Sequence, residues 1–428
     1  MARREDLSTE VLVVGAGASG IPAAIGAARA GAEVILIDED PVIGGAPCDF
    51  YVAMFCGGPI TGVLAEAAEL LRARYSLLPG ASTCLWYLPE SHMRAYHQLL
   101  ASEKRIRIVT GARAVGVLKA GPAARPRVAG GRVEAAGRNR LSVASKITID
   151  ATGTGAVARL AGCKAMYGRE SRAQFGEPHA PPRADRQVQQ CTWMYISQQI
   201  KPGKSFDMMK LEHVKLGVLA VGANGWFSND PEQALRVNPR IYLHWGCAVT
   251  CSDTRDPIAL ARAQQEAFGR MERDHALLRE NGYAVHLAPR IGVRESSRIV
   301  GEHVITENDL RSGRLPEDTV AVGSYPLDIW GDDFGGAGAA ALQYGIPYRA
   351  LVPRGVDGLL LAGKAISGTH RAMSAYRVMP IVAAIGQAAG VAAALCVRHR
   401  WQPRRADPVA IRRTLRGKRQ HVQLSFAG

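Results

Sequence analysis

The first forty residues alternate between apolar runs and small-residue stretches in a way that predicts a strand, a helix and a second strand. Residues 11–14 are four consecutive apolar residues, as expected for a buried strand. A stretch rich in Ala and Gly follows and predicts a closely packed helix that ends near Gly31. Residues 34–37 form a second apolar run, which ends in Asp38. This order is typical of a parallel sheet covered by helices.

Three glycines, Gly15, Gly17 and Gly20, lie between the first predicted strand and the helix. In this position Gly-x-Gly-x-x-Gly allows a tight turn, a close backbone approach to a pyrophosphate and close packing of helix on strand. The helix N-terminus offers unpaired N–H groups and a partial positive charge to a diphosphate. Asp38 is placed to accept hydrogen bonds from an adenosine ribose. The stretch therefore predicts a dinucleotide-binding site.

Two later stretches have a related organisation. The apolar strand predicted over residues 146–150 ends in Ala151-Thr152-Gly153, and that over residues 358–362 ends in Gly363. A polar loop follows Gly363, and Pro380 opens an Ala- and Gly-rich helix. Between these stretches the pattern changes to short strands and one long helix, capped by Asp256-Pro257 and ended at Gly282. Residues 121–137, rich in Gly, Ala, Pro and Arg, predict a hairpin turn region.

These motifs resemble those of FAD-dependent oxidoreductases. After Asp38 comes Gly44-Gly45, and the chain also carries Arg290-Ile-Gly-Val-Arg294-Glu295-Ser-Ser-Arg298 and Ile346-Pro-Tyr348-Arg349. Together they are similar to a poorly characterised FAD-dependent family related to the fumarate reductase and succinate dehydrogenase flavoproteins. The resemblance runs from Val11 to about Leu395. Where the relatives usually have Thr after the Gly-Gly pair, this chain has Cys48.

The resemblance implies an α/β fold: a glutathione-reductase-like FAD-binding Rossmann domain, with a parallel sheet and helices on both sides, and a second α+β substrate domain. The expected division is 1–165 and 345–397 for the FAD-binding domain, 166–344 for the substrate or cap domain, and 398–428 for a basic helical tail. It implies non-covalent FAD, with the following candidate cofactor-binding residues: Gly15, Gly17, Ala18, Ser19, Gly20, Asp38, Glu39, Gly44, Gly45, Ala46, Ala114, Ala151, Thr152, Gly153, Gly363, Arg377, Pro380 and Ile381.

The candidate catalytic residues are His370, Arg371, Arg294 and Tyr348. His370 and Arg371 lie between the last predicted strand and helix, so we expect them to project toward the flavin or its substrate. An imidazole there could take the substrate proton, and an arginine could hold a carboxylate or the flavin anion. For Arg294, Glu295 and Arg298 two interpretations stay open: an internal salt-bridge network between domains, or direct substrate contact.

Composition adds three constraints. The net charge of +15 is uneven, because residues 398–419 hold nine Lys or Arg and one acid. We expect a solvated helical tail there; nucleic-acid binding is disfavoured because no aromatic interleaving accompanies the charge.

No apolar run of about 18 residues is evident and the first ten residues are charged, so the sequence favours a cytoplasmic protein without a membrane partner. The eight cysteines show no zinc or Cys-x-x-Cys spacing, so no metal is expected.

The predicted function is transfer of a hydride between flavin N5 and a small organic substrate, with an anionic substrate favoured by the basic charge. The direction, the electron acceptor and homo-oligomerisation stay open. The alternatives are a flavin monooxygenase or halogenase, a flavin-bearing binding protein, and thiol redox chemistry through Cys48 or Cys56. Monooxygenases usually carry Gly-Asp where this chain has Gly363-Lys364, and the Trp-rich halogenase signature is missing.

Overall fold

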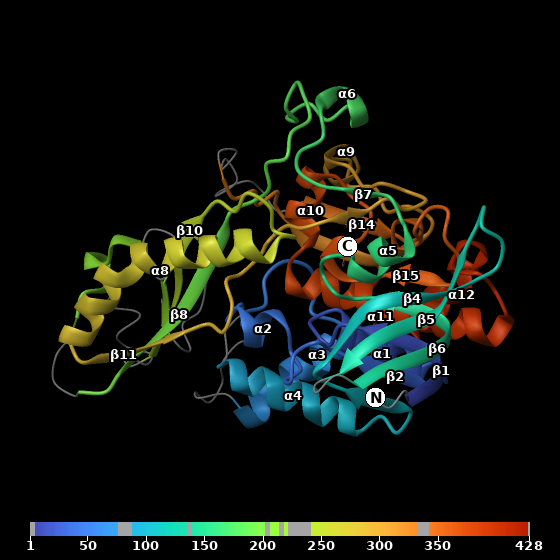
Figure 1. Cartoon of the computed structure of the whole chain (residues 1–428), viewed down its shortest axis with the longest axis horizontal. Helices are drawn as coiled ribbons and strands as arrows, with labels where there is room; N and C mark the ends of the chain where they lie inside the picture. Colours follow the sequence, from blue (N-terminus) through green and yellow to red (C-terminus); the bar gives the residue numbers. More distant parts are fainter. Residues whose placement is uncertain are drawn as a thin grey trace.

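The structure is a computed structural model that describes residues 5–75, 88–135, 139–201, 206–213, 218–220, 241–331 and 342–426. Its largest element is a mixed sheet in the order β3-β2-β1-β6-β5-β4, with β15 also paired to β6 (Figure 1). The strands are β1 (Glu5–Val14), β2 (Val34–Ile37), β3 (Ile106–Val109), β4 (Ala112–Ala120), β5 (Arg127–Ala135), β6 (Asn139–Asp150) and β15 (Leu359–Leu361). Strands β3, β2, β1, β6 and β15 run parallel, whereas β5 pairs antiparallel with both β6 and β4.

The predicted strand–helix–strand unit is confirmed as β1, α1 (Gly20–Arg29) and β2. The apolar side chains of β1 from Val11 to Val14 are buried, as are nearly all residues of α1. Helix α1 packs against α11 (Met379–His399), the Ala- and Gly-rich helix predicted near the end of the chain. The turn predicted over 121–137 is wrong in extent, because β5 occupies most of it; alternate residues of β5 pack inward, which outweighs its glycines.

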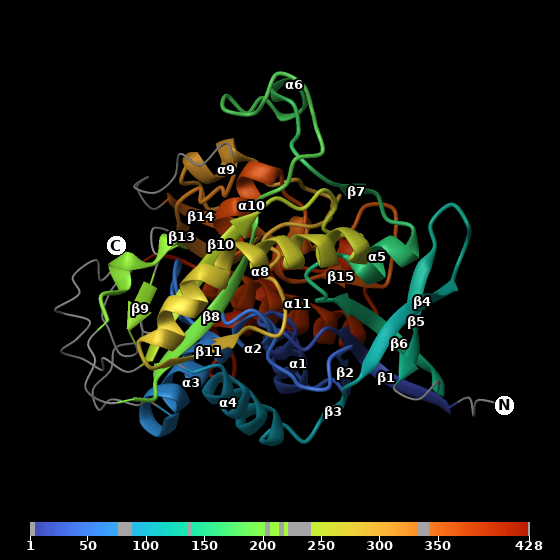
Figure 2. The same cartoon turned by 60° about the vertical axis from the view of Figure 1, so that its left-hand side comes forward.

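A second unit, here called the cap, lies to one side of the main sheet (Figures 1 and 2). It is an antiparallel sheet in the order β11-β8-β10-β9, covered by the long helix α8 (Pro257–Glu280). Its strands are β8 (Cys191–Gln199), β9 (Val218–Ala220), β10 (Ile241–Val249) and β11 (Tyr283–Leu287). Asp256 caps α8 as predicted, since its carboxylate accepts the Ile258 N–H at 3.0 Å.

The remaining elements are shorter. The helices are α2 (Ala46–Asp49), α3 (Gly62–Leu70, continued by a π-type turn over Leu71–Tyr75), α4 (Pro89–Ala101), α5 (Ala156–Ala161), α6 (Arg172–Phe175), α9 (Glu307–Arg311), α10 (His370–Tyr376) and α12 (Pro408–Arg416). Two separate antiparallel pairs are β7 (Ala165–Met166) with β12 (Arg298–Ile299), and β13 (Thr319–Tyr325) with β14 (Leu342–Pro347). The predicted boundary at residue 344 falls within β14, and β13 packs on α11. The domain limits stay predictions.

Two expectations about the end of the chain are wrong. The tail is not a solvated helix: Ile411 and Leu415 of α12 are fully buried, and the Gln420 side chain donates to Gly26 O at 3.0 Å. Helix α11 also has the length and apolarity of a membrane span, contrary to the count of apolar runs. Nearly all of α11 is buried inside the protein, which is the arrangement of a core helix.

Candidate active site

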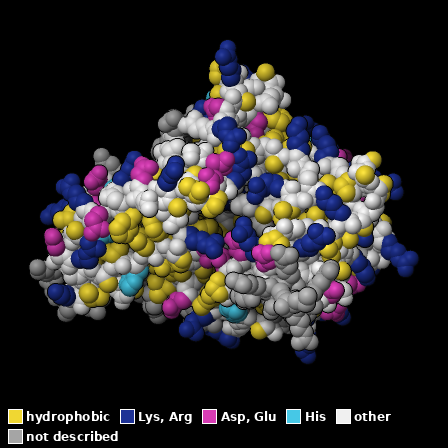
Figure 3. Space-filling view, viewed as in Figure 1, with side chains coloured by type: hydrophobic (Ala, Val, Ile, Leu, Met, Phe, Trp, Pro, Cys, Tyr) yellow, Lys and Arg dark blue, Asp and Glu magenta, His cyan; other side chains and the backbone are white. Residues whose placement is uncertain are grey.

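A cavity of about 2070 Å³ lies between the carboxyl ends of the parallel strands and the cap. It is larger than the roughly 300–1,000 Å³ of a site for one drug-sized molecule, so it has room for a dinucleotide and a second ligand. The surface is hollowed at the centre of the view in Figure 3, with basic and acidic side chains beside the hollow. Ligand sites in open α/β sheets occur at this edge of the sheet.

One end of the cavity is built by the turn between β1 and α1. Gly20 is required there, because a Cβ on it would lie 1.7 Å from Gly15 O. Gly45 faces the same turn, and a Cβ on it would lie 2.6 Å from Gly17 Cα. Two backbone segments without side chains thus border the cavity at the N-terminus of α1. That is the arrangement that a diphosphate needs.

Asp38 lines the cavity at the end of β2. Its carboxylate accepts the Ala16 N–H and, at 2.8 Å, the Asp40 N–H, so it fixes the glycine turn. Burial raises the pKa of Asp38, and the two N–H donors act against that shift. Beside it lies Arg290, which follows the cap sheet in the chain. The guanidinium of Arg290 pairs with Asp40, and the backbone N–H of Arg290 donates to Asp49 O at 3.0 Å. These contacts hold the cap against this end of the cavity.

The other end of the cavity holds a cluster of cations: Arg294, Lys364 and Arg377. Arg377 pairs with Asp328 at 2.8 Å. Arg294 lies over the Trp330 ring, with its guanidinium carbon 3.8 Å from the ring centroid, and donates to Gln190 O at 3.0 Å. Burial, and next the charge of Arg377, lower the pKa of Arg294 to about 9 and that of Lys364 to about 8. This end is therefore electropositive and poorly solvated.

The sequence matches the family model described as "FAD dependent oxidoreductase" over residues 10–415. The chain belongs to this family of FAD-dependent oxidoreductases. It binds FAD as its cofactor and is an enzyme. The search of curated proteins found no match.

Solved structures similar to this FAD-dependent oxidoreductase share little sequence with it. One is a geranylgeranyl bacteriochlorophyll reductase-like protein from Thermoplasma acidophilum (14% identity, TM-score 0.45, covering 96% of this chain and 83% of that chain). Another is the myxobacterial chondrochloren halogenase (12% identity, TM-score 0.43, covering 96% of this chain and 80% of that chain). A third is the E. coli quinol fumarate reductase FrdA (12% identity, TM-score 0.39, covering 96% of this chain and 74% of that chain).

The structure places most of the candidate cofactor-binding residues of this oxidoreductase on the one cavity. The following line it: Gly15, Gly17, Ala18, Ser19, Asp38, Glu39, Gly45, Ala46, Ala114, Ala151, Thr152, Gly153, Gly363 and Arg377. Four do not line it: Gly20, Gly44, Pro380 and Ile381. Ile381 is fully buried, and the neighbours of these helix residues, Val378, Met379 and Val382, face the cavity instead. The paired glycine segments, Asp38 and the α1 N-terminus fit a bound FAD.

Three of the four candidate catalytic residues are placed away from the cavity, contrary to expectation. Tyr348 is buried and its hydroxyl donates to Pro403 O at 2.8 Å. The guanidinium of Arg371 pairs with Glu307. The backbone N–H of His370 donates to Glu170 at 2.8 Å, and its Nδ1 lies 2.7 Å from Glu295. Buried carboxylates from distant parts of the chain thus draw Arg371 and His370 inward, whereas Arg294 alone lines the cavity.

The structure separates the residues of the Arg294, Glu295 and Arg298 motif: Glu295 and Arg298 form an internal salt bridge, whereas substrate contact stays a prediction for Arg294. Arg298, fully buried, pairs with Glu295 and, at 2.6 Å, with Glu170. Glu295 also accepts the Gln189 N–H at 3.0 Å, so the pair joins segments before and after the cap. Arg294 points instead into the cavity wall.

Several cavity-lining residues were not among the candidates. Lys364 and Asp328 belong to the polar end, and Met54, Met194, Trp245 and Trp330 to an apolar wall. Asp49 also lines the cavity; burial and the charge of Asp40 raise the pKa of Asp49 to about 7. Lys364 could have been found from the sequence, since it stands where related monooxygenases have Asp. The residues of the apolar wall could not, because they come from separate elements.

We expect Cys48→Ser to retain flavin content and activity. Burial raises the pKa of the Cys48 thiol to about 12, so a reactive thiolate is not available near neutral pH. Its Sγ lies 3.5 Å from Pro89 O and does not line the cavity. Activity with the substrate found in the screen below is the measurement; a loss of more than about tenfold in the folded, FAD-loaded variant would support the thiol alternative.

Proposed function

We propose that this oxidoreductase is of the dehydrogenase type and moves a hydride between FAD and a small anionic organic substrate. The observation that carries the proposal is Arg294. It lies in the wall of the cofactor cavity, its pKa is lowered by burial, and within the described residues it forms no ion pair; the nearby Asp328 pairs with Arg377. A poorly solvated cation without an ion-pair partner of its own is costly, and an anionic ligand offsets that cost. The bound flavin supplies the hydride chemistry.

The residues around the cations divide the remaining tasks. Arg294 orients the anion, and its stacking on Trp330 fixes the plane of the guanidinium. Lys364 exchanges the proton, because its pKa of about 8 lies near neutrality. The apolar side chains of Met194 and Trp245 exclude water from the same end. A small-molecule substrate, a separate electron acceptor and a cytoplasmic location are part of the proposal.

The test is an anaerobic screen of a metabolite library against the FAD-loaded protein, read as bleaching of the flavin absorbance. The expected result is bleaching by one class of anionic compounds without oxygen. No bleaching by any compound, together with an oxygen-dependent hydroxylated or halogenated product, would overturn the proposal in favour of the monooxygenase alternative. A protein that cannot be loaded with FAD would contradict the cofactor assignment itself.

Asp38→Ala should weaken FAD binding by about tenfold or more, since hydrogen bonds to a carboxylate contribute about 1.5–3 kcal/mol. The substitution removes both the ribose acceptor and the ties to the Ala16 and Asp40 N–H groups. Fluorescence titration of apoprotein with FAD measures the effect. Glu33→Gln, which removes an exposed carboxylate paired with Arg105, is the control and should bind FAD as the parent does.

A further inference from the structure

We propose that the substrate is a monocarboxylate with an apolar, ring-sized carbon skeleton. This inference rests on the proposed function and names the substrate class of the same site. It follows from two features that adjoin in the cavity: the guanidinium of Arg294, which forms no ion pair with a carboxylate among the described residues, and a wall of aromatic and thioether side chains.

The guanidinium is that of Arg294. It forms one hydrogen bond within the described part of the chain, to Gln190 O, out of five N–H groups. Its stacking on the Trp330 ring holds the plane in place and keeps the edge available for in-plane donors. A carboxylate matches this geometry, because its two oxygens accept parallel N–H bonds from an arginine fork.

The charge balance favours one negative charge on the ligand rather than two. Arg377 is neutralised by Asp328. Nearer the Asp38 end, Arg290 pairs with Asp40, and at the rim Arg255 pairs with Asp253 at 2.6 Å. Burial lowers the pKa of Lys364 to about 8, so this amine loses its charge as pH rises through that value. Above that pH, Arg294 is the buried cation of the cavity, among the described residues, that forms no ion pair with a carboxylate.

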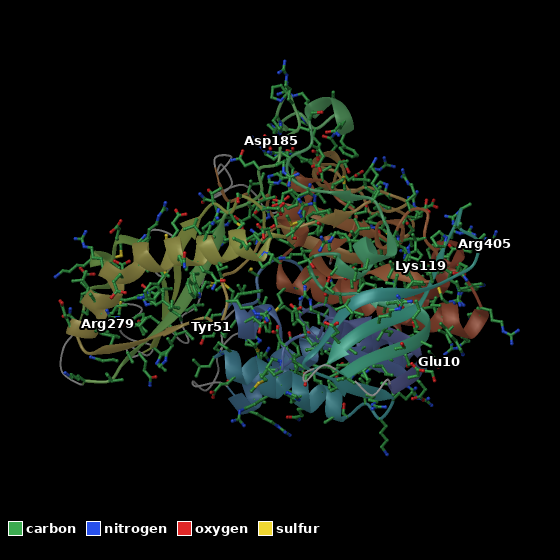
Figure 4. The ribbon with its side chains drawn as sticks, in the orientation of Figure 1. Glu10, Tyr51, Lys119, Asp185, Arg279 and Arg405 are labelled. Carbon is green, nitrogen blue, oxygen red and sulfur yellow. The ribbon has the colours of Figure 1, made fainter. Side chains whose placement is uncertain are left out.

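The apolar wall is formed where the cap meets the main body. Met194 of β8 and Trp245 of β10 pack with Met54, and all three line the cavity although each is less than one-tenth exposed. Tyr51, labelled at the junction of the two units in Figure 4, packs against the same cluster. A flat hydrocarbon ring buries apolar area against such a wall, with favourable sulfur–aromatic contacts. A small dicarboxylate would instead place its second charge there unpaired.

The test titrates the FAD-loaded protein with four probes: cinnamate, 3-phenylpropionate, the neutral cinnamamide and fumarate. Binding is read by calorimetry and by the change in the flavin absorption spectrum. We expect the two aromatic carboxylates to bind at least about tenfold more tightly than cinnamamide or fumarate. Tighter binding of fumarate or cinnamamide, or binding by neither aromatic acid, overturns the inference.

Variants locate the effect. Arg294→Gln should weaken cinnamate about tenfold or more while leaving cinnamamide unchanged, and Trp245→Ala should weaken both. Arg279→Gln, at the far end of α8 in Figure 4, is the matched control and should change neither. If Arg294→Gln fails to hold FAD, Arg294→Lys, which keeps the charge without the fork, takes its place. Unaltered cinnamate binding in the arginine variant contradicts the inference.

This inference and the proposed function fail in different ways. If the anaerobic screen finds flavin bleaching by a neutral compound or a dicarboxylate, the oxidoreductase proposal stands and the substrate class is wrong. If aromatic carboxylates bind through Arg294 but no compound of any class bleaches the flavin, the site is assigned correctly and the dehydrogenase function is wrong.

Discussion

Replacing Lys364 by methionine should slow anaerobic flavin reduction by the substrate about 100- to 10,000-fold, the usual contribution of a positioned proton-transfer group. Lys364 lines the cavity immediately after Gly363, at the polar end that also holds Arg294 and Arg377. Its Nζ donates to Val293 O, which fixes the amine in place. With His370 drawn into a buried carboxylate network, Lys364 is the group at this end whose pKa suits proton transfer near neutral pH.

The pH dependence has a definite sign. Burial, then Arg377, lower the pKa of Lys364 from the ordinary lysine value to about 8, so the neutral amine becomes available as pH rises through that value. If the amine takes the substrate proton, flavin reduction should rise with pH and level off above about 8. A bound carboxylate favours the charged amine and so raises the pKa of Lys364 in the complex. The rise of kcat with pH should therefore lie at higher pH than the rise of kcat/KM.

The matched control is Lys364→Arg, which keeps the positive charge but cannot release a proton near neutrality. It should be as slow as Lys364→Met and should lose the pH limb. Both variants should retain FAD, measured by absorbance per protein. Full activity of the arginine variant, or an unshifted pH limb in the methionine variant, would show that Lys364 contributes charge alone and takes no proton.

The nucleotide end of the site could be predicted from the sequence because its determinants are local. The apolar run of β1, the glycine turn and Asp38 lie within 28 residues, residues 11–38. The place of each follows from the local backbone of a strand–turn–helix unit that binds a dinucleotide. Gly17 and Gly45 were each predicted to bind the cofactor, and the structure adds that their backbones lie against each other. The fold class was predicted from the resemblance to FAD-dependent oxidoreductases, and the strand, helix and strand over residues 11–37 are consistent with it.

The catalytic end could not be predicted in the same way, because its side-chain directions depend on partners far away in the chain. His370 begins helix α10, between the last strand and α11 as expected, but Glu170 and Glu295 hold it away from the cavity. No sequence feature near His370 predicts its contacts with these two carboxylates. The apolar wall likewise joins Met54 to Trp245 through the packing of the cap, a contact that no local pattern encodes.

Replacing Gly390 by alanine should destabilise the protein by an amount at the upper end of the roughly 1–3 kcal/mol typical of overpacking. In α11 this glycine faces α1, and a Cβ there would lie 2.0 Å from Ala23 O, a backbone atom that cannot turn aside. The helices would have to move apart along their whole contact. The denaturant midpoint of the apoprotein measures the loss.

The control is Gly269→Ala in α8, where a Cβ meets nothing within 4 Å. The same substitution there should stabilise by up to about 1 kcal/mol, through helix propensity alone. Gly386→Ala adds a link to the site: its Cβ would lie 2.0 Å from Ser19 O, at the N-terminus of α1, so FAD affinity should fall together with stability. Equal midpoints for the parent and Gly390→Ala would contradict the close contact between α1 and α11.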